Sequence, residues 1–142
     1  MRIVQATNED IMYVLGRLHL NYSPSMIGIS AISDSGKLYC CCLIIISSES
    51  CVIMHIVVDN PIGLKNNTFF KESFNYIFNT ADKLTASVFV PEDNEKSVKF
   101  CKKIGFNEIA RIPDGASAGK DTLVMVMQKD TCKWIAGSND NG

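Results

Sequence analysis

Apolar and polar residues alternate along the chain in a way that predicts strands and helices in turn. A short strand is predicted at residues 2–6. Apolar residues at helical spacing then predict a helix that begins after Thr7, an N-cap residue, and ends near His19. Three β-rich runs follow at residues 26–33, 38–47 and 51–59, separated by polar turns. Consecutive strands joined by such short turns predict an antiparallel meander.

The second half of the chain alternates between helices and strands. Four apolar residues, Phe70, Phe74, Ile77 and Phe78, fall on one face of a helix that begins near Thr68. A strand is predicted at residues 84–90, followed by a short helix that ends at Gly105, a residue suited to a left-handed C-cap. Residues 106–112 and 122–128 form a predicted hairpin, whose loop at 113–121 is rich in Gly, Ala and Ser.

This order of elements predicts an α/β (α+β) fold with a mixed sheet covered by helices. A further helix is allowed between residue 19 and the strand at 26–33. The central strands are apolar on both faces, as strands covered on both sides should be. We expect one domain over residues 1–135. Residues 136–142 have no core-forming side chains and are predicted to be a polar tail.

Composition and charge narrow the range of functions. Apolar residues make up 46% of the 142 residues and charged residues 20%, which is typical of a globular domain. The net charge is −1 and no basic stripe is present, which argues against nucleic-acid binding. No apolar run approaches the roughly 20 residues of a membrane helix. The first residues are too polar for a signal peptide, so we expect a cytoplasmic protein.

Six cysteines are the main candidates for metal or redox chemistry. Cys40, Cys41 and Cys42 are consecutive on a predicted strand, so their side chains alternate between its faces and form no local metal-binding claw. The sequence has no C-x-x-C and no histidine nearby at ligand spacing. We interpret the cysteines as buried, reduced thiols rather than as ligands or disulfides.

Residues 94–106 carry a resemblance to a known family. Asn94 is followed three residues later by Ser97, then by a helix containing Phe100, and finally by the pair Gly105-Phe106. This pattern resembles the closing motif of the GNAT family of acyl-CoA-dependent N-acyltransferases, and the element order resembles the GNAT fold. The resemblance implies a largely antiparallel central sheet of about six or seven strands, flanked by about three or four helices. It also implies acetyl transfer from acetyl-CoA to an amine of a small molecule or protein.

The resemblance assigns a set of residues to the acyl-CoA. In the family, backbone N–H groups of a Gly-rich turn at a helix N-terminus cradle the pyrophosphate. The corresponding turn here contains a single glycine, Gly63, and departs from the family pattern. The implied binding residues are Val58, Lys65, Asn66, Asn67, Thr68, Asn94 and Ser97. The alternative is that Asn67 or Thr68 simply caps the helix.

Two residues are candidates for the proton transfers. His55 lies on the strand that carries the catalytic base in the family, and its ordinary pKa suits a base. Cys101 stands where the family usually carries a tyrosine acid, and a thiol can protonate a leaving thiolate. The alternatives are a structural histidine on a strand face and a small buried residue on a helix face.

Three functions follow from these observations. The first is an N-acetyltransferase that uses acetyl-CoA. The second is a catalytically inactive GNAT-fold protein that assembles with other proteins, because the 94–106 segment also resembles that of internal virion proteins of short-tailed phages. Such a protein would reside in the host cytoplasm or the virion. The third, a redox or metal protein built on the cysteines, is the least favoured. A homo-oligomer is compatible with either of the first two functions.

Overall fold

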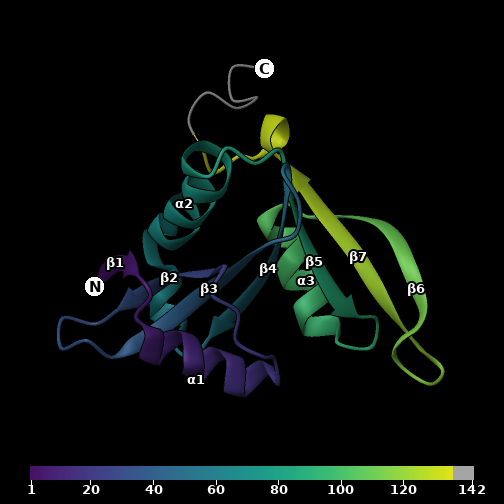
Figure 1. Ribbon diagram of the computed structural model, residues 1–142, viewed down its shortest axis with the longest axis horizontal. Coiled ribbons are helices and arrows are strands. Elements are labelled where there is room, and N and C mark those ends of the chain that lie inside the picture. The colour runs from purple at the N-terminus through teal and green to yellow at the C-terminus, as the bar shows by residue number, and fades with distance from the viewer. Residues whose placement is uncertain (136–142) are drawn as a thin grey trace.

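The computed structural model describes residues 1–135, and the predicted tail at 136–142 lies outside the described residues. Within these residues the chain forms a seven-stranded sheet in the order β1-β2-β3-β4-β5-β7-β6 (Figure 1). The strands are β1 (Arg2–Gln5), β2 (Met26–Ile32), β3 (Leu38–Ile46), β4 (Cys51–Val58), β5 (Thr85–Pro91), β6 (Asn107–Ser117) and β7 (Lys120–Gln128). Neighbouring strands are antiparallel, except that β4 and β5 are parallel. The predicted mixed, largely antiparallel sheet is therefore confirmed.

Helices cover the sheet from both sides. They are α1 (Asn8–Leu18), α2 (Thr68–Asn75) and α3 (Glu95–Ile104), with the 3-10 helices η1 (Pro61–Asn67) and η3 (Lys129–Thr131) and the π-helix η2 (Tyr76–Thr80), which continues α2. The N-cap prediction for α1 is confirmed, because the Thr7 hydroxyl accepts the Asp10 N–H at 3.1 Å. Gly105 ends α3 with a φ of 124°, as its predicted C-cap role requires. No helix between residues 1 and 135 is long and apolar enough to cross a membrane.

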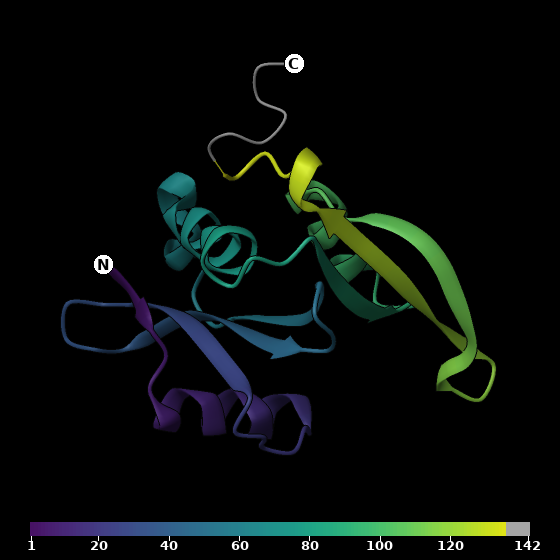
Figure 2. The same cartoon turned by 45° about the horizontal axis from the view of Figure 1, so that its top comes forward.

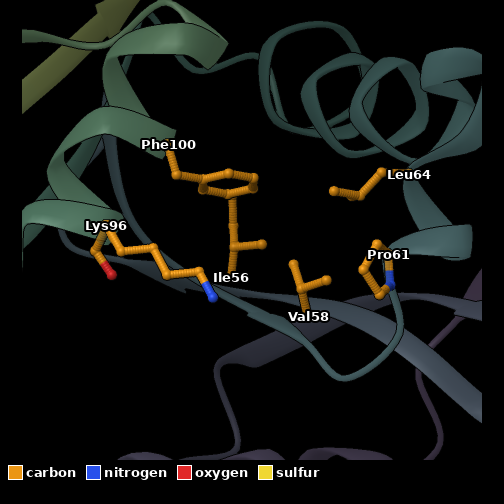
Figure 3. Close-up of a pocket in the computed structure, with 7 residues that line it drawn as sticks. Ile56, Val58, Pro61, Leu64, Lys96 and Phe100 are labelled. Atoms are coloured by element: carbon orange, nitrogen blue, oxygen red, sulfur yellow. The ribbon is translucent and has the colours of Figure 1, made fainter.

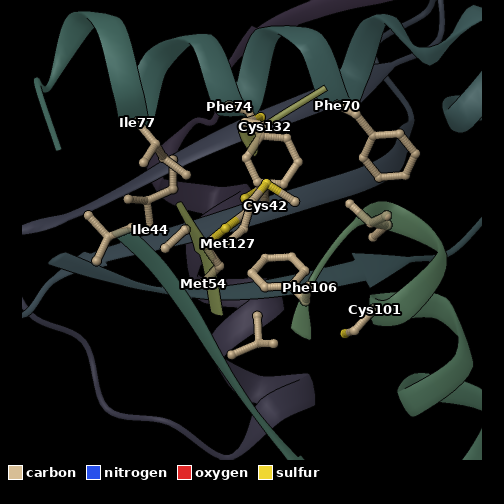
Figure 4. Close-up of a cluster of buried hydrophobic side chains, with 14 of the residues drawn as sticks. Cys42, Ile44, Met54, Phe70, Phe74, Ile77, Cys101, Phe106, Met127 and Cys132 are labelled. Carbon is tan, nitrogen blue, oxygen red and sulfur yellow. The ribbon is translucent and has the colours of Figure 1, made fainter. Parts of the chain in front are cut away.

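Two apolar clusters hold the layers together. On one face of the sheet, α1 packs its Ile11, Val14 and Leu15 against β3 and β4. On the other face, α2 and α3 enclose the main core, in which Phe74 from α2 lies against Phe106 at a ring-centroid separation of 6.1 Å (Figure 4). The four aromatic and aliphatic positions predicted for the buried face of α2 are all buried there, Ile77 and Phe78 on its η2 continuation.

The consecutive cysteines follow the alternation of their strand. Cys41 belongs to the cluster beneath α1, whereas Cys40 and Cys42 belong to the main core. All three are fully buried, and burial raises the pKa of Cys40 to about 12 and that of Cys41 to about 11. These thiols are therefore protonated packing groups, as predicted. Among residues 1–135 no group of three His, Cys, Asp or Glu side chains is placed to hold a metal ion.

The structure corrects two details of the sequence analysis. The predicted loop at 113–121 is too long, because β6 continues to Ser117 and β7 begins at Lys120. The carboxylates of Asp114 and Asp121 accept backbone N–H groups, and Gly119 adopts a φ of 78°, so the turn needs few residues. The further helix allowed before β2 is also absent from the described residues, since α1 leads directly into β2.

Candidate functional site

The parallel strands β4 and β5 separate soon after they meet. They pair only at Cys51–Thr85, Val52–Ala86 and Ile53–Ser87, at the start of both strands. Beyond these pairs β4 stays with β3, and β5 stays with β7 along its full length. The sheet therefore opens between β4 and β5 from about Met54 onward.

A cavity of about 150 Å³ occupies this opening. We call it the interstrand cavity, and it is lined by Leu18, Met54, His55, Ile56, Val88, Phe89, Val90, Pro91, Asn94, Ser97, Phe100 and Cys101. Successive residues of a strand point to opposite faces of a sheet. Since the lining includes successive residues of both β4 and β5, the cavity is bordered from the α1 side as well as from the α3 side of the sheet.

A second, larger groove adjoins this cavity on the α3 side. It has a volume of about 350 Å³ and is lined by Ile56, Val58, Pro61, Leu64, Lys96, Ser97 and Phe100 (Figure 3). Ile56, Ser97 and Phe100 line both spaces. The walls of the groove are mostly apolar. Figure 3 shows the Lys96 ammonium reaching across from α3 toward the β4 side. The arrangement suits an extended ligand that has an apolar chain and a negatively charged group.

The start of α2 has an unusual backbone. Asn66 and Asn67 adopt left-handed conformations, with φ values of 62° and 61°. Asn67 is the N-cap residue of α2, but its side chain makes no capping hydrogen bond. The alternative that Asn67 caps the helix holds for its position but not for a side-chain hydrogen bond, and Thr68 is already the first helical residue. The first-turn N–H groups of α2 consequently have no side-chain cap.

Gly63 lies in η1, and packing rather than a phosphate explains it. A Cβ atom at this position would lie 2.5 Å from Cys40 Sγ and 2.9 Å from Tyr39 Cβ. Such distances are far inside van der Waals contact, so glycine alone lets η1 lie directly on β3. Asn60, the residue before η1, fixes the start of this helix because its side chain accepts the Ile62 N–H at 3.1 Å.

Two hollows flank the start of α2, and they divide the residues predicted to bind the cofactor. Lys65, Asn66 and Thr68 line a hollow of about 530 Å³ near the N-terminus of the chain. Asn67 lines a different hollow of about 490 Å³, which also contains Lys103 and Lys133. This second hollow shares Leu64 and Phe100 with the groove, so it extends the groove toward two lysines.

The two predicted proton-transfer residues line the same interstrand cavity. His55 is partly buried, and desolvation lowers the pKa of its imidazole, which is therefore neutral and able to accept a proton at pH 7. Cys101 is 8% exposed, and burial raises the pKa of its thiol to about 11. The site thus holds an available base and a weak acid.

The remaining predicted residues have structural roles beside the cavity. Asn94 caps α3, because its side-chain oxygen accepts the Ser97 N–H at 3.2 Å. Both residues line the interstrand cavity, and Ser97 and Val58 line the groove. The sequence analysis missed Lys96, Lys103 and Phe89. The periodicity of α3 offered a signal for the two lysines, but no signal separated Phe89 from the buried residues of its strand.

Comparisons with known proteins support the fold. No protein-family model matches the sequence, and no curated protein matches it. The structure is similar to that of spermidine/spermine N-acetyltransferase SpeG from Vibrio cholerae, with a TM-score of 0.70, 12% identity, and coverage of 89% of this chain and 91% of the other. A chimera of the Vibrio cholerae enzyme and hSSAT gives a TM-score of 0.68 at 12% identity, covering 90% and 96%. The chain therefore has a GNAT-like fold, the fold of this N-acetyltransferase.

Proposed function

We propose that this protein transfers an acetyl group from acetyl-CoA to an amine. One observation carries the proposal: the interstrand cavity is bordered from both faces of the sheet, with a long groove on the α3 side and His55 on the α1 side. A donor in the groove and an acceptor beside His55 would meet in the opening. Reactions between two bound molecules need this kind of convergence.

The groove matches the chemistry of an acyl-CoA. Ile56, Val58 and Phe100 offer apolar surface to the pantetheine arm. Lys96 in the groove, with Lys103 in the adjoining hollow, supplies positive charge for phosphate groups. The uncapped first turn of α2 adds backbone N–H groups and the positive end of the helix dipole. These features support binding even though the glycines of the family turn are missing.

The cavity residues support a direct transfer. The acceptor nitrogen forms a bond to the carbonyl carbon, the carbon–sulfur bond breaks, and one amine proton passes to His55. The departing thiolate takes up a proton. Transfer from a thiol of pKa about 11, as in Cys101, to a thiolate whose acid has a pKa of about 8.5 is uphill by roughly 3 kcal/mol. Cys101 thus stays a proposed donor, but a weak one.

Calorimetry with acetyl-CoA tests the proposal. Acetyl-CoA should bind, and Lys96→Glu should weaken the binding about tenfold or more, because it places a negative charge in the groove. Lys65→Glu should have a smaller effect, since Lys65 lines the separate hollow. Lys37→Glu, in an exposed turn outside these spaces, is the matched control. The absence of binding heat at millimolar acetyl-CoA would overturn the proposal.

A second function is favoured by the outermost strand. β6 is exposed along its whole length, and Ile109 and Ile112 on it are 62% and 43% exposed. Exposed edge strands pair readily with other chains. An inactive protein that binds protein partners, such as virion proteins or a second copy, would use this edge. A stable complex together with an absence of acetyl-CoA binding would favour this function over acetyl transfer.

A further inference from the structure

The sheet is covered unevenly on the α1 side. α1 packs against the N-terminal strands, whereas β5, β7 and β6 extend away from it (Figure 2). On these strands the apolar side chains of Phe89 and Ile112 are 41% and 43% exposed. This uncovered face begins at the interstrand cavity, because Phe89 also lines that cavity.

Strand register shows which side chains share this face. Residues paired directly across antiparallel strands point to the same side of a sheet. Val124 on β7 pairs with Phe89 on one side and with Ala110 on the other. Thr122 likewise pairs with Pro91 and with Ile112. We call the surface made by Phe89, Pro91, Ala110, Ile112 and Val124 the apolar shelf.

The arginine of strand β6 lies on the opposite face. Leu123 is buried in the main core and pairs with Arg111, so Arg111 points toward the α3 side of the sheet. There it forms an ion pair with Glu92 at 2.7 Å. None of the described residues that line the interstrand cavity is Asp or Glu. The cavity beside the shelf therefore offers no carboxylate, and that of Asp93, two residues beyond Pro91, is ion-paired with Lys120 at 2.7 Å.

We propose that the acceptor is a primary amine carried by an apolar or aromatic group, and that polyamines are poor acceptors. The proposal rests on the proposed function. A polyamine carries several positive charges, and removing them from water without carboxylate partners is costly. A monoamine can lose its single proton and place its nitrogen beside His55, while its apolar group covers Phe89 and Val124. This differs from the spermidine that names the structurally similar enzyme.

The size of the interstrand cavity agrees with an acceptor that enters it only by its amine end. A volume of about 150 Å³ is comparable to a cavity that holds one benzene ring. Once an acetyl group enters from the groove, only the amine end of an acceptor fits beside it. The remainder must lie on the shelf, where an aromatic ring can stack on the exposed Phe89 ring. Phenethylamine has this shape.

Binding without acetyl-CoA gives the first test. The chain has two histidines, so the His55 imidazole signal is easily assigned by NMR with a His55→Gln variant. Phenethylamine should shift this signal at concentrations at least tenfold lower than spermidine does. Phe89→Ala should weaken phenethylamine binding about tenfold, whereas Met12→Ala, an exposed apolar residue of α1, should leave it unchanged. Equal or tighter binding of spermidine would overturn the inference.

Turnover separates this inference from the proposed function. With acetyl-CoA, the ratio of kcat/KM for phenethylamine to that for spermidine should exceed ten, and Phe89→Ala should lower it. Faster acetylation of spermidine would contradict the acceptor class but leave acetyl transfer intact. Preferential phenethylamine binding without any acetyl-CoA binding would support the shelf as an amine site and overturn acetyl transfer.

Discussion

Helix α3 borders the groove, and helix α2 begins beside the hollow that extends it. Both helices begin at an asparagine, but the two asparagines act differently. At α3, the side chain of Asn94 accepts the Ser97 N–H and the helix is capped. At α2, the backbone of Asn67 adopts a left-handed conformation, and its side chain makes no capping bond. One asparagine side chain satisfies a first-turn N–H group, whereas the other makes no such bond.

The two helix starts show that similar residues and similar backbone geometry are separate properties. The α3 segment resembles the GNAT pattern at Asn94 and at Gly105-Phe106, and its cap stabilises the helix. The α2 turn lacks the glycines of the GNAT pattern, but asparagine is one of the few other residues that adopts the left-handed conformation readily. Consecutive left-handed residues can therefore still turn the first N–H groups of α2 outward. The proposed anion site at the start of α2 therefore does not require those glycines.

Of the substitutions considered, Gly63→Ala should lower stability most. It tests whether the position of the α2 start depends on the packing of η1. The new Cβ would lie 2.5 Å from Cys40 Sγ, so η1 must lift from β3 and carry the start of α2 with it. Overpacking of this kind costs roughly 1–3 kcal/mol. Thermal unfolding should show the lower stability, and calorimetry should show weaker acetyl-CoA binding. An unchanged melting temperature would mean that η1 does not need this close contact.

The matched control for this substitution is Gly16→Ala. Gly16 lies in α1, and a Cβ there would have nothing within 4 Å. Replacing a helical glycine by alanine stabilises a helix by up to about 1 kcal/mol. The two glycine-to-alanine changes should therefore shift the melting temperature in opposite directions.

Asn67→Val tests the left-handed turn itself. A β-branched residue at a φ of 61° is strained, and the left-handed conformation costs roughly 1–2 kcal/mol more than the right-handed one. We expect a loss of stability of about this size and a weaker affinity for acetyl-CoA. Asn67→Gly keeps the conformation accessible and should retain the affinity. If valine and glycine bind acetyl-CoA equally well, the turn does not form the anion site.

Most of the fold was predictable because it depends on local patterns. The meander of β2, β3 and β4 follows from apolar runs and polar turns, and the caps at Thr7 and Gly105 follow from residue type. The hairpin loop was predicted too long because Gly, Ala and Ser are typical of loops. Two aspartates and Gly119 close that turn through hydrogen bonds that composition does not reveal.

The candidate site was less predictable, because it depends on where two strands part. His55 on β4 and Cys101 on α3 line one cavity because β4 and β5 part after three residue pairs and α3 lies beside the opening. The raised pKa of Cys101 and the lowered pKa of His55 both arise from burial, which requires tertiary structure. Phe89 lies between the buried Val88 and Val90 in an apolar stretch of β5. Its exposure follows from the absence of a covering helix beside β5 in the described chain, which a single strand does not encode.

Asn94→Ala should lower stability least, and it tests the role of the capped helix α3. Loss of the bond to the Ser97 N–H removes a cap, which costs about 1 kcal/mol of stability. Asn94→Asp keeps an acceptor at the N-cap and should restore most of that stability, so the pair isolates the hydrogen bond in thermal unfolding. Since the bond stabilises α3 rather than forming the anion site at α2, acetyl-CoA affinity should fall less than in Asn67→Val. A larger fall would show that the capped helix, and not the uncapped one, provides the main contact with the donor.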